Sequence, residues 1–434
     1  MDKITVIGAG LAGCEAAHII SKLGVRVDLV EMKPTKKTPA HKTDKFAELV
    51  CSNSLKANRV DSAAGLLKQE MRLLGSICLE AAEIAKVAAG GALAVDRDIF
   101  SDYVTNSIKN DKNITVTNKV VEDIATDDGI YVIATGPLTD DKLAHSIEKF
   151  CDAESLNFYD AAAPIVTADS IDFESAFIAS RYDNENSQTG DYINCPLNRE
   201  EYENFHTELI SAEGATLHEF DKPLKVYEGC MPIEVLAKRG TDSIRFGPMK
   251  PVGLRDPKTG HRPWAVVQLR KENSAGTLYN LVGFQTNLKF GEQKRVFSMI
   301  PALKNAEFVR YGVMHRNTFI NSPKLLNRDL SLKKAKNIFF AGQLSGVEGY
   351  MESAASGIIA GINAVNSLQG KAPMILPNTT MIGALLNYIT DESVLNFQPM
   401  GANFGILPPL ETHIRDKRER YAALAERSLK GEWI

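Results

Sequence analysis

Three glycines near the N-terminus have the spacing that binds the phosphates of a dinucleotide. The stretch GAGLAG, from Gly8 to Gly13, matches the pattern G-x-G-x-x-G. In this motif Gly8 allows a tight turn, Gly10 lets the backbone approach a pyrophosphate, and Gly13 lets a helix pack against the preceding strand. The free N–H groups at the start of that helix then face the phosphates. A glycine-rich turn in an ordinary α/β protein is the alternative for the motif alone.

The segments around the glycines support the dinucleotide interpretation. Lys3–Ile7 (KITVI) predicts a short strand, and a helical pattern runs over Cys14–Leu23. The apolar run Val25–Val30 predicts a second strand, which ends at Glu31. An acid at this place binds the ribose hydroxyls of an adenosine moiety. The order of strand, turn, helix, strand and acid therefore predicts a Rossmann-like unit, without deciding between NAD and FAD.

Two later segments extend the predicted cofactor site and favour FAD. Ile130–Gly136 (IYVIATG) is an apolar strand ending in Ala-Thr-Gly, as in two-segment flavin-binding folds. Asn337–Gly361 is an apolar strand, a glycine-rich loop and a helix that opens near Glu352, which places a second helix N-terminus at the cofactor. The residues predicted to contact the cofactor are Gly8, Ala9, Gly10, Leu11, Ala12, Gly13, Glu31, Thr135, Gly136, Gly342, Gln343, Gly349 and Glu352.

Six scattered cysteines offer thiol chemistry, not a zinc motif or a disulfide framework, because no C-x-x-C pair occurs. Cys51 precedes small polar residues that suit a turn or a helix N-cap. A thiol there is either a reactive thiolate, activated by a helix N-terminus and nearby cations, or a buried structural cysteine. Cys230 lies in Glu-Gly-Cys-Met-Pro, a constrained loop.

The bulk composition is that of a globular enzyme. A chain of 434 residues is too long for one compact hydrophobic core, so more than one domain is expected. The formal net charge is −4 and the isoelectric point about 6.1, which gives no global support for nucleic-acid binding. No apolar run has the length of a membrane span, and a strand predicted from residue 3 leaves no room for a signal peptide. We expect a cytoplasmic location.

Two local stretches are basic. Arg245–Lys271 contains seven Lys/Arg and one Asp, a charge of +6, with Trp264 inside it. Met32–Lys45 contains five lysines and one Asp, a charge of +4. Basic surfaces with interleaved aromatic residues suit phosphate contact and base stacking, although a solvated charged face is the common alternative.

The remaining pattern is mostly helical. Ala63–Ala85 is predicted as one long amphipathic helix, Arg199–Ala212 as a helix in a region without Rossmann character, and Thr412–Leu429 as the last helix.

Taken together, the motifs resemble one family, the folate- and FAD-dependent tRNA uracil-5-methyltransferases called TrmFO. The resemblance spans nearly the whole chain, and ELVCSNS and EGCMPIE are its most specific stretches. The other matching stretches include GAGLAG, AGGALAVDRDIFS, RFGPMKPVGL, NLVGFQTNLKFGEQKRV, RYGVMHRNTFI and FFAGQLSGVEGYMESAASG. The opening motif and the FFAGQ region also look like the MnmG (GidA) flavoproteins, which are longer and lack the two cysteine blocks.

The resemblance implies an α/β fold: a Rossmann-like FAD-binding domain with an inserted α/β domain and a helical C-terminal region. We expect the FAD-binding domain over residues 1–155 and 331–375, the insertion over 156–330, and the C-terminal region over 376–434. The sequence leaves open whether the protein is a monomer or a homodimer.

The resemblance also implies a reaction, in which a methylene group from 5,10-methylenetetrahydrofolate becomes the C5 methyl of uridine 54 in the tRNA T loop. FAD serves as cofactor and NADPH or NADH as reductant. Cys230 is the expected nucleophile and Cys51 the expected base, while the other four cysteines are structural. The residues expected at the folate or RNA substrate are Lys250, Arg255, Asn287, His315 and Arg316. The segments Arg245–Lys271 and Lys33–Lys45 are expected to meet RNA phosphates, and no metal is expected.

Three alternatives stay open from the sequence. The same chemistry on a uridine of large ribosomal RNA would leave the catalytic blocks unchanged. A flavin oxidoreductase acting on a small molecule would not need two cysteines in separate, distinctive loops. A non-catalytic flavoprotein that binds RNA would hold FAD and RNA without transferring a methyl group.

Overall fold

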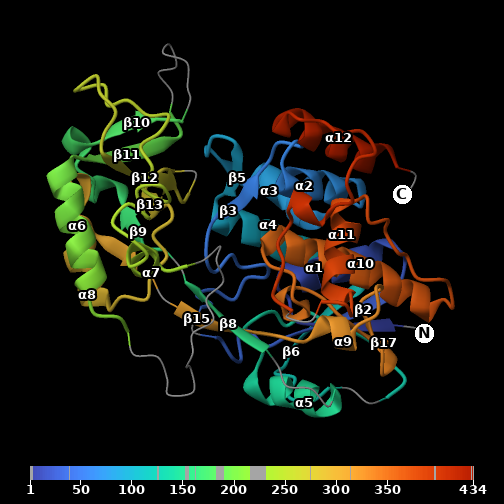
Figure 1. The fold of residues 1–434 in the computed structure, drawn as a ribbon. Helices are drawn as coiled ribbons and strands as arrows, with labels where there is room; N and C mark the ends of the chain where they lie inside the picture. The colour runs from blue at the N-terminus through green and yellow to red at the C-terminus, as the bar shows by residue number, and fades with distance from the viewer. Residues whose placement is uncertain are drawn as a thin grey trace.

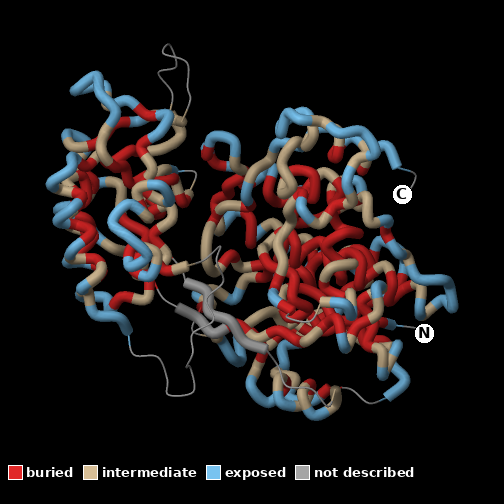
Figure 2. The backbone as a smooth tube through the Cα atoms, viewed as in Figure 1, coloured by how far each residue is buried: buried red, intermediate tan, exposed pale blue. Residues whose placement is uncertain are grey.

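The computed structural model has two lobes joined by a two-stranded ribbon (Figure 1). It describes residues 3–38, 40–124, 127–151, 156–161, 163–181, 190–215, 231–273, 275–312, 314–394, 397–431 and 433, with the side chains of 156–161 and 314–316 outside this description. Each lobe has its own buried core, visible as two separate buried regions in Figure 2. We call residues 3–151 and 320–433 the first lobe and residues 163–312 the second lobe.

A six-stranded sheet organises the first lobe, in the order β16-β17-β7-β1-β2-β6. All neighbouring strands are parallel except β16 and β17. Their bounds are β1 Lys3–Ile7, β2 Arg26–Glu31, β6 Ile114–Asn118, β7 Ile130–Ile133, β16 Ser331–Leu332 and β17 Ala335–Phe340. In the register Ile7 lies opposite Val30 and Ile133. The carboxyl ends of the parallel strands therefore share one edge, where ligands of open α/β sheets bind.

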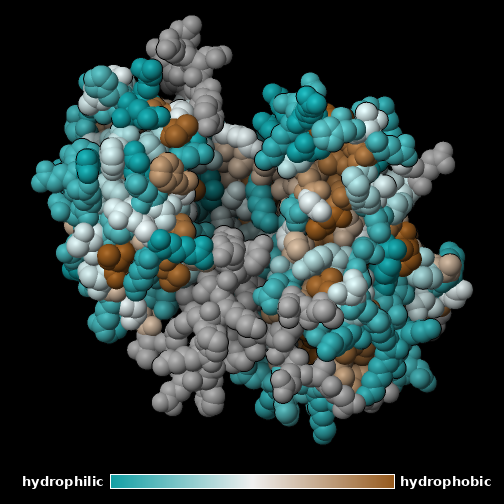
Figure 3. Space-filling view, viewed as in Figure 1, coloured by the Kyte–Doolittle hydropathy of each residue, from teal (hydrophilic) through white to brown (hydrophobic). Residues whose placement is uncertain are grey.

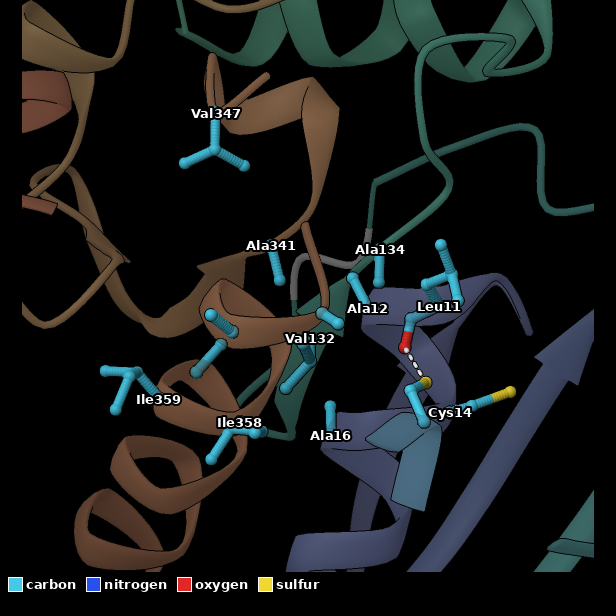
Figure 4. Close-up of a cluster of buried hydrophobic side chains, with 14 of the residues drawn as sticks. Leu11, Ala12, Cys14, Ala16, Val132, Ala134, Ala341, Val347, Ile358 and Ile359 are labelled. Carbon is cyan, nitrogen blue, oxygen red and sulfur yellow. Dashed lines mark hydrogen bonds between the residues drawn. The ribbon is translucent and has the colours of Figure 1, made fainter. Parts of the chain in front are cut away.

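Two helices from opposite ends of the chain pack together against this sheet: α1 (Leu11–Lys22) and α10 (Tyr350–Leu368). Small residues let them come close, because a Cβ atom on Gly357 would overlap the carbonyl of Ala12. Figure 4 shows Ala12 and Ala16 of α1 facing α10 in this buried cluster. The packing brings the N-terminus of α10 to the same sheet edge as the N-terminus of α1.

Further helices surround this core: α2 Ala63–Leu73, α3 Ile77–Ile84, α4 Arg97–Asn110, α5 Asp141–Cys151 and α9 Ser322–Leu325. A small antiparallel sheet, β3 (Ser54–Ala57), β5 (Ala92–Val95) and β4 (Lys86–Val87), lies on the side of the second lobe (Figure 1). Two C-terminal helices, α11 (Met381–Thr390) and α12 (Lys417–Lys430), complete the lobe. Among the residues described, no helix combines the length and the apolar character needed to cross a membrane.

Buried Glu70 of α2 ties the C-terminal helices to the rest of the lobe. Its carboxylate accepts the backbone N–H groups of Met381 (2.7 Å) and Ile382 (2.8 Å), and the hydroxyl of Ser428 (2.6 Å). The free N–H groups at the start of α11 are satisfied in this way. Burial raises the pKa of Glu70 to about 7.

An antiparallel sheet forms the second lobe, in the order β10-β11-β12-β13-β9-β14. Its strands are β9 Ile165–Thr167, β10 Phe177–Ala179, β11 Tyr192–Leu197, β12 Ala265–Lys271, β13 Leu278–Leu281 and β14 Phe308–Arg310. The helices α6 (Arg199–Ser211), α7 (Ile233–Ala237) and α8 (Phe290–Phe297) share its core. The ribbon between the lobes is β8 (Leu156–Ala161) paired with β15 (Met314–Phe319).

Three predicted elements differ from the structure. The last helix is predicted from Thr412, whereas α12 begins at Lys417 after its N-cap Asp416. The single helix over Ala63–Ala85 is wrong: α2 ends before Gly75, which has a φ of +80°, and Ser76 caps the new helix α3. Helix α1 begins at Leu11 and not at Cys14, because Gly10 already serves as its N-cap. The apolar spacing continues across the latter two boundaries, so periodicity alone does not locate them. The predicted α/β class with a Rossmann-like domain is confirmed.

Candidate active site

The three glycines of the opening motif have three different surroundings. Gly8 has a φ of +99°, and a Cβ atom there would lie 2.6 Å from the carbonyl oxygen of Ala134. A Cβ on Gly13 would overlap the carbonyl of Gly8. A Cβ on Gly10 would meet no atom within 4 Å, so this position opens onto a cavity. The outer glycines therefore close the turn and pack the helix, and Gly10 leaves room for a ligand at the N-terminus of α1.

Glu31 occupies the end of β2 beside this turn. Its carboxylate accepts the N–H groups of Ala9 (2.6 Å) and Lys33 (2.9 Å), and the residue is 5% exposed. Each carboxylate oxygen can accept a second hydrogen bond, so ribose hydroxyl groups can still bind there.

One elongated cavity gathers most of the predicted cofactor residues. From the glycine turn and β2 it is lined by Gly8, Ala9, Gly10, Leu11, Ala12 and Glu31. From the segment after β7 it is lined by Thr135 and Gly136, and from the segment after β17 by Gly342 and Gln343. A Cβ on Gly136, which has a φ of +73°, would also meet nothing within 4 Å. Backbone from three strand ends thus forms a groove with glycines at the points of closest approach, which fits a dinucleotide such as FAD.

Three predicted cofactor residues lie outside the lining of this cavity: Gly13, Gly349 and Glu352. Glu352 is buried, and its carboxylate accepts the Lys56 ammonium at 2.7 Å and the N–H of Ala402 at 3.1 Å. It thereby joins the start of α10 to β3 and to the C-terminal region.

Sequence reasoning missed several residues that line the cavity: Lys33, His41, Glu48, Val50, Lys119, Val120, Val121, Tyr350 and Ser353. Lys119 could have been found, because it follows β6, which neighbours β2 on the same sheet edge. Val50 and Tyr350 could not, since only the fold brings them together.

Tyr350 connects the cofactor cavity with Cys51. Tyr350 lines the cavity, and its hydroxyl oxygen accepts the backbone N–H groups of Cys51 (2.6 Å) and Ser52 (3.1 Å). Burial raises the pKa of Tyr350, so the hydroxyl stays protonated. The half-buried Cys51 therefore lies one residue beyond the cavity wall at Val50.

Arginines of both lobes hold the loop around Cys51. Arg97, at the start of α4, donates to the carbonyl oxygens of Leu49 and Cys51, the latter at 3.2 Å. Arg310 of β14 donates to the carbonyl of Val50. In the part of the chain that the structure describes, the second lobe thus reaches across to the backbone beside the thiol.

Arg270 of β12 binds the other end of this loop. Its guanidinium donates to Asn53 Oδ1 at 3.1 Å and to Ser52 Oγ at 2.9 Å. The Asn53 amide in turn donates to the carbonyl of Lys271 at 2.9 Å. Arg270 is 6% exposed, so these bonds are made away from water.

Among the described residues, positive charges outnumber negative charges around the Cys51 loop. Arg97 forms an ion pair with the buried Glu272, whereas Arg270 and Arg310 bring two more positive charges. Burial lowers the pKa of both Arg270 and Arg310, and the nearby carboxylate of Glu272 partly offsets this. Guanidinium groups keep their charge in proteins, so three cations bind the loop that carries Cys51.

The remaining residues predicted to bind substrate or act in catalysis are spread over several elements of the second lobe and the ribbon. Cys230 lies outside the described residues, and α7 begins three positions after it in the chain. His315 and Arg316 lie on β15, opposite Asp160 and Tyr159 of β8, with their side chains outside the described part. Asn287 donates its backbone N–H to Glu234 at 2.8 Å.

Lys250 and Arg255 lie in the loop before β12. The carbonyl of Met249 accepts the N–H of Val266, near the start of β12, whereas Arg270 contacts the Cys51 loop near its end. Arg181 donates to the carbonyl of Val252 at 2.7 Å and to Gln268 Oε1 at 3.0 Å, so the loop that carries the two basic residues lies along β12.

The lysines of the segment Lys33–Lys45 are mostly paired with carboxylates of the protein. Lys33 pairs with Glu48 (3.6 Å), Lys36 with Asp140, Lys37 with Asp44 (2.7 Å) and Lys45 with Asp98 (3.0 Å). Of these four pairs, only that of Lys33 with Glu48 is buried, and those of Lys36, Lys37 and Lys45 lie at the surface. The contact of this segment with RNA phosphates stays a prediction.

Three of the other cysteines have structural surroundings. Cys14, Cys78 and Cys195 are fully buried, and burial raises the pKa of each thiol. Cys14 donates to the carbonyl of Ala9 at 3.4 Å, the dashed contact in Figure 4. Cys151, at the end of α5, is partly buried.

Comparison with known proteins agrees with this architecture. The family model "Glucose inhibited division protein A" (GIDA) matches residues 3–372. The structure of GidA from Aquifex aeolicus superposes with a TM-score of 0.70 at 18% identity, over 99% of this chain and 74% of that chain, which shows a shared fold. This chain belongs to the GidA family of α/β flavoproteins.

More similar relatives define a narrower group. A protein of Acetivibrio thermocellus is 58% identical over 430 residues, covering 99% of this chain and 98% of the relative. A protein of Halalkalibacterium halodurans is 56% identical over 427 residues, covering 98% and 97%. Both are named methylenetetrahydrofolate--tRNA-(uracil-5-)-methyltransferase TrmFO. Within the GidA family, the chain is a member of the TrmFO family.

Proposed function

We propose that this protein methylates C5 of uridine 54 in the T loop of tRNA, with 5,10-methylenetetrahydrofolate as carbon donor. It is a folate- and FAD-dependent methyltransferase, and NADPH or NADH is its reductant. The observation that carries this proposal is a dinucleotide groove that ends at a cysteine loop, in a chain 58% identical to TrmFO over nearly its whole length. We place the reaction in the cytoplasm.

The reaction requires a nucleophile and a base that act on the uracil ring. C5 of uracil is a weak nucleophile, and addition of a thiolate to C6 makes it enolate-like. After the one-carbon unit has bonded to C5, a base must remove the C5 proton before the thiol can leave. When bound and reduced by NADPH or NADH, the flavin would supply the two electrons that convert the transferred methylene group to a methyl group.

We assign Cys230 as the nucleophile and Cys51 as the base. The position of Cys51 supports the second assignment, because its loop adjoins the cofactor cavity through Val50 and Tyr350. Arg97, Arg270 and Arg310 bind this loop, and nearby cations are a setting in which cysteines act as thiolates.

The second lobe provides the larger basic surface for RNA. Lys250 is half-buried and Arg255 exposed in the loop before β12, so both side chains can reach phosphate oxygens. Neutralising both should weaken tRNA binding and reduce its dependence on salt. Unchanged salt dependence would contradict this assignment.

We also propose a division into domains. Residues 1–155 and 331–375 form the FAD-binding domain, 156–330 the insertion and 376–434 the C-terminal region. The composition of the sheets supports it, because the six-stranded sheet takes strands from 3–133 and 331–340, and the antiparallel sheet takes them from 165–310.

Methyl transfer in vitro tests the function directly. The protein is mixed with FAD, NADPH and methylenetetrahydrofolate labelled in its methylene carbon, and with a tRNA transcript or a large ribosomal RNA fragment in separate reactions. Wild type should label the T-loop uridine of tRNA, and Cys51→Ala and Cys230→Ala should not. Cys151→Ala, which changes a cysteine outside both catalytic blocks, should keep full activity.

Each other outcome has a defined meaning. Label only in the ribosomal fragment would preserve the mechanism and replace the RNA. No label in either RNA, from a folded protein that holds FAD and oxidises NADPH, would favour a small-molecule oxidoreductase. Activity that survives Cys230→Ala would remove the thiol nucleophile from the mechanism.

A further inference from the structure

A stack of two aromatic rings and two arginines lies on the surface of the second lobe. The Arg245 guanidinium is 3.8 Å from the ring centroid of Trp264 and 5.6 Å from that of Phe246. Arg199, at the start of α6, lies 5.3 Å from the Trp264 centroid. Arg245 also donates to the carbonyl of Trp264 at 2.9 Å, which fixes it in place.

The two rings of this stack differ in accessibility. Trp264 is half-buried, and both Arg199 and Arg245 contact its ring. Phe246 is 72% exposed, more than any other large hydrophobic side chain among the described residues. Single exposed hydrophobic side chains are common on protein surfaces. Phe246 differs from them because Arg245, which is itself stacked on Trp264, lies against its ring. Trp264, the tryptophan noted in the basic stretch of the sequence, therefore supports Arg245, and the ring exposed to solvent is that of Phe246.

The segment of chain that carries the exposed ring is basic. Between Lys238 and Arg262 the chain has seven Lys/Arg and two Asp, a charge of +7 − 2 = +5. The N–H of Lys250 donates to the carbonyl of Gly247 at 3.2 Å, so Lys250 is one turn away from Phe246. This setting matches a negatively charged partner that offers flat rings.

The ring is also connected to the element that follows Cys230. Ser243 donates its hydroxyl to the carbonyl of Leu236 in α7 at 2.6 Å, and the side chain of Leu236 would lie 3.5 Å from a Cβ on Gly247. The turn that carries Phe246 is therefore folded onto α7, which begins three residues after Cys230. RNA bound at α7 can reach this ring.

We propose that Phe246 is a stacking platform for an unpaired nucleobase of the RNA substrate, supported from below by Arg245 and Trp264. This inference rests on the proposed function, since it needs an RNA substrate. The cations around the ring contact the phosphates on either side of the stacked base. Stacking is tolerant of sequence, so Phe246 contributes affinity and orientation more than base identity.

Binding of a tRNA transcript to the holoenzyme, followed by fluorescence anisotropy, tests the proposal. Phe246→Ala should weaken binding about 10-fold, and Phe246→Leu should weaken it nearly as much, because leucine keeps apolar area without a ring. Phe246→Trp should bind as tightly as wild type or more tightly. Phe173→Ala, which removes another exposed phenyl ring of the same lobe (48% exposed), should bind as wild type does.

Further readouts separate this inference from the proposed function. Thermal unfolding and NADPH oxidation without RNA should be equal in wild type and Phe246→Ala, since the ring contacts solvent. Equal affinity of wild type, Ala and Leu variants would overturn the platform, even if wild type methylates tRNA. A variant that changes the sedimentation behaviour of the protein and not its RNA affinity would overturn it in favour of contact with a second copy. Failure of wild type to bind or methylate any RNA would overturn both.

Discussion

The cofactor groove and the Cys51 loop lie next to each other but are held in place differently. The groove is formed by main chain, at the ends of parallel strands and the starts of α1 and α10. The loop is held by side chains, with Arg97 and Tyr350 from the first lobe and Arg270 and Arg310 from the second. Figure 3 shows a hollow between the two lobes above the atoms drawn in grey, and contacts such as that of the Tyr192 hydroxyl with the carbonyl of Ala89 (3.0 Å) also join the lobes.

Because of this difference, we expect FAD binding and methyl transfer to depend on different residues. A backbone groove inside one lobe keeps its shape when the lobes move relative to each other. A loop that both lobes hold responds to such movement. Changes in the groove should therefore affect FAD binding and stability, and changes around the loop should affect methyl transfer while FAD stays bound.

The largest expected effect is in the groove. Gly13→Ala places a Cβ against the carbonyl of Gly8, so α1 must move away from the turn. We expect loss of FAD binding and a fall of about 3 kcal/mol in the free energy of unfolding. Flavin absorbance of the purified protein and chemical denaturation measure both.

Gly291→Ala is the matched control, since Gly291 also lies in the first turn of a helix, α8, but has no atom within 4 Å of an added Cβ. This variant should be stabilised by about 0.5 kcal/mol, because alanine loses less backbone entropy on folding. A yellow, normally stable Gly13→Ala protein would contradict the packing role of this glycine.

The next effect concerns the loop. Arg270→Ala removes the donor to Ser52 and Asn53 and leaves Cys51 imprecisely placed. We expect methyl transfer at saturating tRNA to fall about 100-fold, with FAD affinity unchanged. Arg270→Lys should recover little, because an ammonium cannot span both acceptors. Arg295→Ala, an exposed arginine of the same lobe, should leave the rate unaffected.

A pH effect should appear in the first lobe. The pKa of Glu70 is raised from 4.5 to about 7 by burial, so the folded state favours its protonated form. The stability that this provides is complete below about pH 4.5 and is lost as pH rises through 7. We expect the free energy of unfolding to fall by roughly 2 kcal/mol between pH 5 and pH 8 through this group.

Denaturation of wild type and Glu70→Gln at both pH values measures this effect. The variant should be less stable at pH 5 and less dependent on pH, although Glu15, whose pKa burial also raises to about 7, keeps part of the dependence. Identical pH dependence of the two proteins would show that Glu70 is ionised throughout. The arginines around Cys51 keep their charge over this range, so the loop should be unaffected.

The smallest effect concerns the link between the two regions. Tyr350→Phe keeps the ring that lines the cavity and removes the acceptor for the Cys51 and Ser52 amides. We expect about a 10-fold slower methyl transfer, the size of one or two lost hydrogen bonds. The rate of NADPH oxidation should stay as in wild type. Tyr388→Phe, which loses a long hydrogen bond to Gln398 (3.4 Å), serves as control.

The fold of the first lobe was largely predictable, because its signals are local. The strand bounds at Lys3–Ile7 and near Glu31 follow from short apolar runs and their flanking residues. The break between α2 and α3 was not predicted, since a glycine near the end of an apolar helix pattern has two interpretations. The assignment of Phe246 was missed because exposure depends on what packs against a side chain.

What the sequence alone determined was the glycine turn, the acid at the end of β2, the α/β class and the two distinctive cysteine blocks. These features follow from the backbone conformations that glycines permit and from the spacing of residues close together in the sequence. Such local signals can be recognised without knowing the tertiary structure. Only the tertiary structure decided that Tyr350 binds the Cys51 amide and that Arg270 and Arg310 of the second lobe bind the same loop. It also decided which carboxylates pair with the lysines of Lys33–Lys45, as Asp140 does with Lys36. Each of these contacts joins residues far apart in the chain, and their partners are fixed by packing, not by spacing.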